Sequence, residues 1–119
     1  MFETINRAAL YLAPRKAMVE WIKVISPGNT TDLSNPLEHD NGRIYLIPEF
    51  DDAQELIEWL KVNYEPIFEN ELYFWCTSAE YWPKDRNWDL FLAWMYVSFQ
   101  SMVMDSLGSR IMKDQESLN

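Results

Sequence analysis

Cysteine, histidine and glycine are all scarce in this 119-residue chain, and each scarcity argues against a class of function. Cys76 is the only cysteine, so the paired cysteines of a disulfide-rich secreted scaffold are missing. His39 is the only histidine, which leaves too few ligands for a typical zinc site. Three glycines are too few for a glycine-rich phosphate-binding loop. Zinc, disulfide and nucleotide chemistry therefore have little support.

Basic residues and long apolar runs are scarce as well. The chain has 10 Lys and Arg against 19 Asp and Glu, and a formal net charge of −9. Such a charge opposes binding to nucleic-acid phosphates and to anionic membranes. The longest apolar run, Leu90 to Val97, is less than half of the roughly 20 residues that a membrane-spanning helix needs. Since the first residues also lack a signal-peptide pattern, we expect a cytoplasmic protein.

The acidic residues that are present gather between residues 49 and 71. This segment has eight acidic residues and one basic residue, a net charge of −7, whereas residues 1–48 have five of each sign. On a helix of about 100° per residue, the segment forms an acidic stripe opposite an apolar one. The acidic stripe consists of Asp51, Glu55, Glu58, Glu65 and Glu69, and the apolar stripe of Ala53, Leu56, Ile57, Leu60, Tyr64, Ile67 and Trp75. The pattern predicts a helix with an acidic outer face and a core-facing side.

Local patterns predict an α+β fold, with a small, about three-stranded sheet packed by three to four helices. Strands are expected at residues 8–13, 43–47 and 102–104. Apolar residues at i, i+3, i+4 and i+7 predict a first helix between Pro14 and Ser26. We expect one globular domain over residues 1–108 and a polar, frayed tail over residues 109–119.

The acidic segment should begin its helix at Asp52, because Asp52 and Glu55 have the spacing of a capping box. Pro66 removes a backbone hydrogen bond and predicts a kink or a break. The apolar phase nevertheless continues to Trp75, so one bent helix and two aligned helices fit equally well.

A further helix is expected to begin at Asp85 or Asn87, whose side chains commonly cap helices. Its expected end lies near Gln100, and apolar residues surround most of its circumference. A helix with so little polar surface should lie in the middle of the fold.

A small metal- or ligand-dependent enzyme is one alternative. Its site would combine the loop residues Glu38, His39 and Asp40 with the segment 49–52. The sequence lacks the ligand spacings of zinc and calcium sites, and no nucleophile motif surrounds Cys76. We therefore assign no catalytic residue, metal or cofactor.

The acidic stripe favours a non-enzymatic module that binds a basic protein surface, as an inhibitor, an immunity protein or a regulator would. Trp82 lies in the connector after the acidic helix and is a candidate aromatic anchor for that partner. The competing interpretation is that the acids only keep the protein soluble and that Trp82 covers the edge of the core. A self-associating structural domain is another alternative, because aromatic residues make up 15% of the chain and suit a homodimer interface.

Several short stretches resemble a family of small acidic bacterial proteins that has no established activity. The stretches are Asn6-Arg7-Ala8 with Pro14, Tyr45-Leu46-Ile47-Pro48-Glu49, Ile67-Phe68-Glu69 with Trp75, Trp82-Pro83 with Arg86, and Ser101-Met102-Val103. The resemblance implies a bacterial, cytoplasmic, stand-alone domain. It transfers no catalytic residue to this chain.

Overall fold

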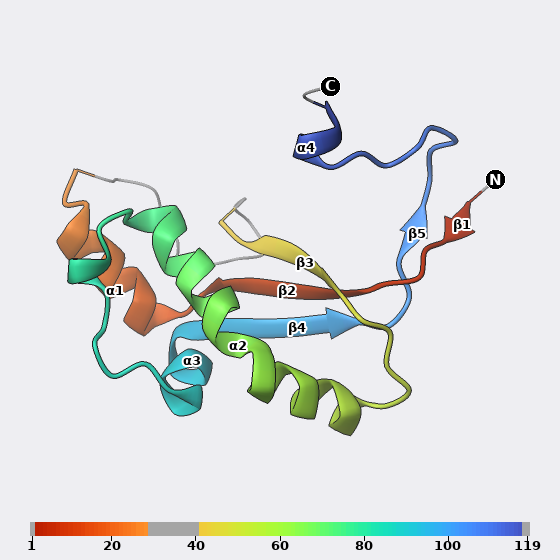
Figure 1. The fold of residues 1–119 in the computed structure, drawn as a ribbon. Helices are drawn as coiled ribbons and strands as arrows, with labels where there is room; N and C mark the ends of the chain where they lie inside the picture. Colours follow the sequence, from red (N-terminus) through yellow and green to blue (C-terminus); the bar gives the residue numbers. More distant parts are fainter. Residues whose placement is uncertain (1, 29–40, 118–119) are drawn as a thin grey trace.

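The computed structural model describes residues 2–28 and 41–117, and within these ranges the fold is α+β (Figure 1). The order of elements is β1 (Glu3–Thr4), β2 (Ala8–Pro14), α1 (Lys16–Ile25), β3 (Arg43–Ile47), α2 (Ala53–Trp75), the 3-10 turn η1 (Ala79–Tyr81), α3 (Trp88–Trp94), β4 (Met95–Gln100), β5 (Met104–Asp105) and α4 (Asp114–Ser117). The expected fold class, a small sheet packed by helices, is confirmed.

The central sheet has three antiparallel strands in the order β3-β2-β4. The expected strands at residues 8–13 and 43–47 are confirmed. Along β2 the side chains of Ala8, Leu10 and Leu12 are fully buried, and they belong to the same core cluster as Leu56 and Leu60 of α2. Figure 1 shows α2 crossing this face of the sheet, so the helix and the sheet enclose the core between them.

Helix α1 starts two residues after Pro14, and the predicted first helix is confirmed. Met18, Val19 and Ile22 are its buried side chains. The helix ends at Ile25 and is capped by Ser26, whose backbone N–H donates to the Ile22 carbonyl.

Helix α2 is one continuous helix that passes through Pro66. A proline at this position leaves the carbonyl of Val62 without its helical donor. Val62 is 83% exposed and Pro66 is exposed too, so water can hydrate that carbonyl. The alternative of two separate helices is excluded by this continuity. The helix tolerates Pro66 because the proline lies on its solvent-exposed side and does not disturb the apolar side.

The prediction of a third helix reaching Gln100 is wrong. Helix α3 begins where expected, with the Asn87 side chain accepting from the Leu90 N–H at 2.8 Å, but it ends at Trp94. The chain then continues as β4, which pairs with β2 along its whole length. Residues 95–100 alternate, with Met95 fully buried and Tyr96 exposed. The alternation of side chains in β4 could not be recognised in the sequence, because the residues before it form an uninterrupted apolar run.

A second, two-stranded sheet joins β1 to β5. The last strand, expected at residues 102–104, is β5 at Met104–Asp105, and it pairs with β1 and not with the central sheet. Strands of two residues carry no readable alternation, which explains the displaced boundary. The segment expected to be a frayed tail contains the short helix α4.

Aromatic rings fill the space between α1, α2 and α3. Phe68 of α2 and Phe91 of α3 are buried, with ring centroids 5.4 Å apart. Tyr64 and Trp94 extend this contact on either side. Trp21 of α1 touches Trp94, and its indole N–H donates to the Tyr81 carbonyl at 3.0 Å. These rings hold α2 in a fixed position, so its outer side is presented on a rigid element.

Candidate functional site

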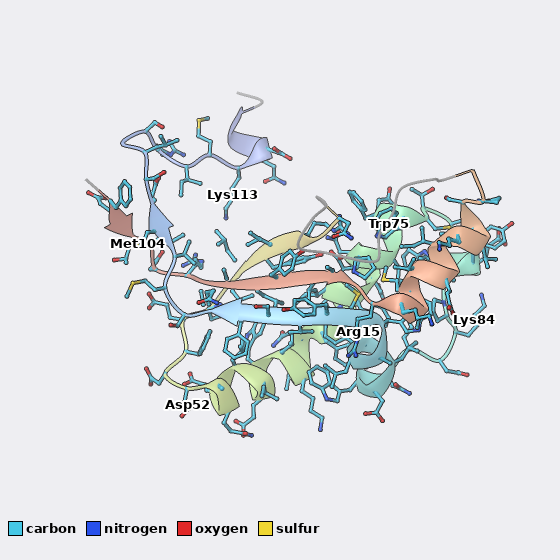
Figure 2. All side chains as sticks on the ribbon, turned by 180° about the vertical axis from the view of Figure 1, so that it is seen from behind. Arg15, Asp52, Trp75, Lys84, Met104 and Lys113 are labelled. Atoms are coloured by element: carbon cyan, nitrogen blue, oxygen red, sulfur yellow. The ribbon has the colours of Figure 1, made fainter. Side chains whose placement is uncertain are left out.

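The first turn of α2 confirms the cap at Asp52 and contains a variant of the capping box, in which Glu55 reaches the residue before the cap. The Asp52 side chain accepts from the Glu55 N–H at 2.8 Å, and the Glu55 carboxylate accepts from the Asp51 N–H at 3.0 Å. Figure 2 shows Asp52 at this end of the helix. Asp52 thus satisfies a backbone donor that the helix itself leaves free, and Glu55 satisfies the backbone donor of the residue before the cap. Their negative charge also suits the positive end of the helix dipole.

The outer side of α2 displays the predicted acidic stripe. Asp51, Glu55, Glu58 and Glu65 are all exposed. The Glu58 carboxylate accepts a hydrogen bond from the Gln54 side-chain amide at 3.1 Å. Because the amide is neutral, the negative charge of Glu58 is not compensated. Among the described residues, Glu65 has no ion pair or hydrogen bond through its side chain. Four of the five predicted stripe residues therefore lie in solvent without a basic partner in the described chain.

The fifth residue of the stripe, Glu69, forms an ion pair with Arg86 at 3.3 Å. Its side chain is 46% exposed, so the pair is a surface one. The Arg86 guanidinium also lies over the Trp82 ring, 5.7 Å from its centroid. Arg86 thereby joins Glu69 to Trp82, a contact that the spacing of these residues does not predict.

Trp82 itself is half-buried at the connector between α2 and α3. Its indole N–H donates to the Cys76 carbonyl at 2.8 Å, and its ring packs against the core cluster. The polar end of the side chain is therefore used within the chain. What Trp82 can offer to a partner is the exposed part of its ring.

An apolar depression of about 300 Å³ lies beside the stripe, between α2, α3 and β4. Its lining consists of Leu56, Ile57, Leu60, Trp88, Leu92, Val97 and Phe99. Ile57 and Leu92 are exposed large apolar side chains at this place. On α2, the exposed Lys61 is four positions after Ile57 and three after Glu58, so Lys61 adjoins both the depression and the acidic stripe.

The inner side of α2 carries an acid that sequence reasoning did not assign to any site. Glu71 is fully buried, and it forms a two-point ion pair with Arg43 of β3. Arg43 Nε donates to Glu71 Oε2 at 2.8 Å, and Nη2 donates to Oε1 at 3.0 Å. The Tyr45 hydroxyl donates to Oε2 at 2.5 Å and accepts from the Asn70 amide at 2.8 Å. Both carboxylate oxygens are thus engaged, as a buried charge requires.

Aromatic rings complete the surroundings of this pair. The Arg43 guanidinium lies 3.7 Å from the centroid of the Phe74 ring, a cation–π contact. Burial, and next the hydrogen bond to Glu71, raise the pKa of Tyr45 above its ordinary value. Tyr45 therefore stays a neutral donor at physiological pH. The cluster ties the start of β3 to the last turns of α2.

The position of Glu71 in the sequence did contain a signal. Glu71 lies four residues after Ile67 and four before Trp75, so it falls within the apolar stripe of the helix. A charged residue in an apolar stripe needs a partner inside the fold. Arg43 is 28 residues away, and no spacing rule connects the two.

The alternative metal or enzyme site falls partly outside the described residues, because Glu38, His39 and Asp40 lie between the two described ranges. The residues of segment 49–52 are exposed or half-exposed at the β3–α2 connection. Within residues 2–28 and 41–117, no group of three or more His, Cys, Asp or Glu side chains is placed to hold a metal ion. The Cys76 thiol is half-buried, and its Sγ lies 3.5 Å from the Ser78 carbonyl oxygen.

Comparisons with protein-family models, with curated proteins and with solved structures found no match to this chain. The resemblance to small acidic bacterial proteins thus remains a prediction. In the described part of the chain, no helix combines the length and the apolar character needed to cross a membrane.

Proposed function

We propose that this chain is a non-enzymatic module that binds a basic protein surface through the outer side of α2. The binding surface comprises Asp51, Glu55, Glu58, Glu65 and Glu69, with Trp82 at its edge. The observation that carries the proposal is the exposure of this stripe, which among residues 2–28 and 41–117 has no basic partner apart from Arg86 at its end.

Helix energetics support a role for the stripe beyond solubility. Glu65 and Glu69 are like charges at i,i+4 within α2, an arrangement that destabilises a helix by about 0.2–0.5 kcal/mol. A lysine at one of these positions would remove the repulsion and keep the surface equally soluble. A basic partner gives the arrangement a use, because opposite charge raises the association rate and selects the partner.

The apolar depression beside the stripe defines the partner further. A basic surface alone would leave Ile57 and Leu92 exposed to water. A basic segment with one apolar side chain would fill the depression while its cationic groups meet Glu58 and Glu65. Inhibitors, immunity proteins and regulators that bind basic proteins all fit this description. Direct nucleic-acid binding and membrane binding do not fit the net charge of −9, and we place the protein in the cytoplasm.

The test is an affinity capture from cell lysate at low salt, followed by elution with a salt gradient. Two variants carry the same change in net charge. The stripe variant replaces Glu55, Glu58 and Glu65 with Gln, and the control replaces Glu3, Glu20 and Glu80, which are exposed on β1, α1 and η1. Gln at position 55 retains the capping-box acceptor.

We expect the wild-type protein and the control to retain the same discrete protein and the stripe variant to lose it. Elution should occur as salt rises, because the screening length falls from about 10 Å at 0.1 M to about 3 Å at 1 M. If both variants lose the protein equally, net charge alone is responsible. If both retain it, the stripe is a solubility feature.

A further inference from the structure

A terminal arm extends from the central sheet at the end opposite α1 and α3 (Figure 1). The arm comprises residues 101–115, with β1 and β5 at its base. Figure 2 shows Met104 and Lys113 on this arm, apart from the helices that enclose the core. The radius of gyration is 16.0 Å, above the roughly 13 to 14 Å of a compact chain of this length.

An irregularity in strand pairing accounts for the change of direction. Ala9 pairs with Gln100 at the end of the central sheet, and Thr4 pairs with Met104 in the small sheet. Between these two pairs, four residues on the first strand (5–8) thus match three on the second (101–103). One extra residue on one strand is the arrangement of a β-bulge, which bends the strands that contain it.

The arm is apolar and largely uncovered. Six large apolar side chains at or near it are more than half exposed, namely Phe2, Met102, Met104, Leu107, Ile111 and Met112. A ribbon with two residues in each strand is not stable by itself in water. The arm therefore needs an apolar surface to pack against.

The same chain contains an apolar surface of this kind. On the face of the central sheet away from α2, Ile44 is 68% exposed, Leu46 is 52% exposed and Tyr96 is 43% exposed. Figure 2, drawn from behind, shows β2 and β4 on the near side, with α2 beyond them. By strand alternation in the pairing register, the outer-face residues are Ala9, Tyr11, Ala13, Ile44, Leu46, Tyr96, Ser98 and Gln100. Ala13 is fully buried, and the other seven belong to the accessible part of this face.

Charge distinguishes this face from the rest of the molecule. None of the eight outer-face residues is charged, although the whole chain has a net charge of −9. The arm carries Asp105, Arg110, Lys113 and Asp114, so its charges cancel. Two copies can bring these surfaces together without repulsion between like charges. Contact between the two α2 helices would instead bring the acidic stripes together.

We propose that two copies of the chain form a symmetric dimer in which the arm of each copy packs on the outer sheet face of the other. Exchange of an identical element is a common route to a closed dimer, because each contact occurs twice. The fifteen residues of the arm and the seven accessible residues of the face make twenty-two per copy, within the about 20–30 residues that each side of a standard interface contributes. The acidic stripes of both copies stay free, so the dimer is independent of the proposed binding function.

The test is light scattering coupled to size-exclusion chromatography over a range of protein concentrations. The wild-type chain should elute with twice its mass of 14.2 kDa and dissociate only on dilution. An arm variant, Leu107→Asp with Ile111→Asp, and a face variant, Ile44→Asp with Leu46→Asp, should each weaken the dimer at least tenfold. All four side chains are exposed, so circular dichroism should show folded monomers.

Mixing the two variants tests the exchange itself. The arm variant retains an intact face and the face variant an intact arm, so one of the two contacts can form between them. A mixture should therefore yield a heterodimer that neither variant forms with itself. A wild-type chain that stays monomeric at every concentration, or variants that do not complement each other, would overturn the proposal. Glu58→Gln with Glu65→Gln serves as a control that should leave the dimer intact.

Discussion

Two glutamates on the same helix, Glu65 and Glu71, have opposite surroundings. Glu65 is exposed and has no side-chain partner among the described residues, whereas Glu71 is fully buried and accepts three hydrogen bonds. Glu71 lies six positions after Glu65, and this spacing turns the side chain from solvent to the core. Position around the helix, and not residue type, therefore decides whether an acid of α2 is available to a partner or holds the fold together.

Removal of the cation at Glu71 should have the largest effect. Arg43→Met keeps an unbranched apolar stem near Phe74 but leaves the buried carboxylate without its charge partner. We expect the free energy of unfolding to fall by about 3–5 kcal/mol, as when other buried ion pairs are broken. Urea unfolding at pH 7 measures this loss. Arg43→Met combined with Glu71→Leu should recover much of it, and a double variant no more stable than the single one would argue against the ion pair as the cause.

Removal of the hydroxyl that donates to the same carboxylate should have a smaller effect. Tyr45→Phe retains the ring and deletes one hydrogen bond to a charged group, so we expect a loss of about 1.5–3 kcal/mol. Tyr96→Phe is the matched control, because that ring is exposed on another strand of the same sheet. Equal effects of the two substitutions in urea unfolding would show that the hydroxyl bond to Glu71 adds nothing.

The same tyrosine predicts a change of stability at high pH. Because the fold raises the pKa of Tyr45, the contribution of Tyr45 to the free energy of unfolding is present in full below pH 10, which is about its pKa in the unfolded chain. Above that pH the unfolded chain ionises first, and the contribution falls as pH rises. The difference in unfolding free energy between the wild-type protein and Tyr45→Phe should stay constant from pH 7 to 9 and shrink above pH 10. A difference that grows with pH would contradict the direction of the shift.

The cap at the start of α2 should matter less than the buried cluster. Asp52→Ala removes the acceptor of the Glu55 N–H, and we expect a loss of about 1 kcal/mol. Asp51→Ala is the neighbouring control, because that residue contributes only its backbone N–H to the capping box. Thermal unfolding compares the two variants. Asp52→Ala should unfold at a lower temperature than Asp51→Ala, and the opposite order would contradict the assignment of the cap to Asp52.

Much of this arrangement could be predicted from short-range patterns. The strands at β2 and β3, the first helix and the capping box each follow from residues within one or two turns of one another. The outer stripe of α2 followed from helical phase alone, and its exposure agrees with that phase.

The parts that could not be predicted depend on distant partners. Strand β4 follows a helix without a turn residue between them, so its alternation had no visible start. The Arg43–Glu71 pair and the Arg86–Glu69 pair join segments 28 and 17 residues apart. Whether a charged residue finds such a partner depends on how the elements pack, which local spacing does not reveal.

The most direct test of the account is one substitution made at both glutamates. Glu65→Gln and Glu71→Gln remove the same charge from the same helix with the same change of shape, and urea unfolding compares them at pH 7. We predict that Glu65→Gln changes the free energy of unfolding by no more than about 0.5 kcal/mol. Glu71→Gln should lower it by about 2 kcal/mol or more, since an amide cannot accept all three donors. Equal losses, or a larger loss at position 65, would contradict the division of α2 into a structural side and a free acidic side.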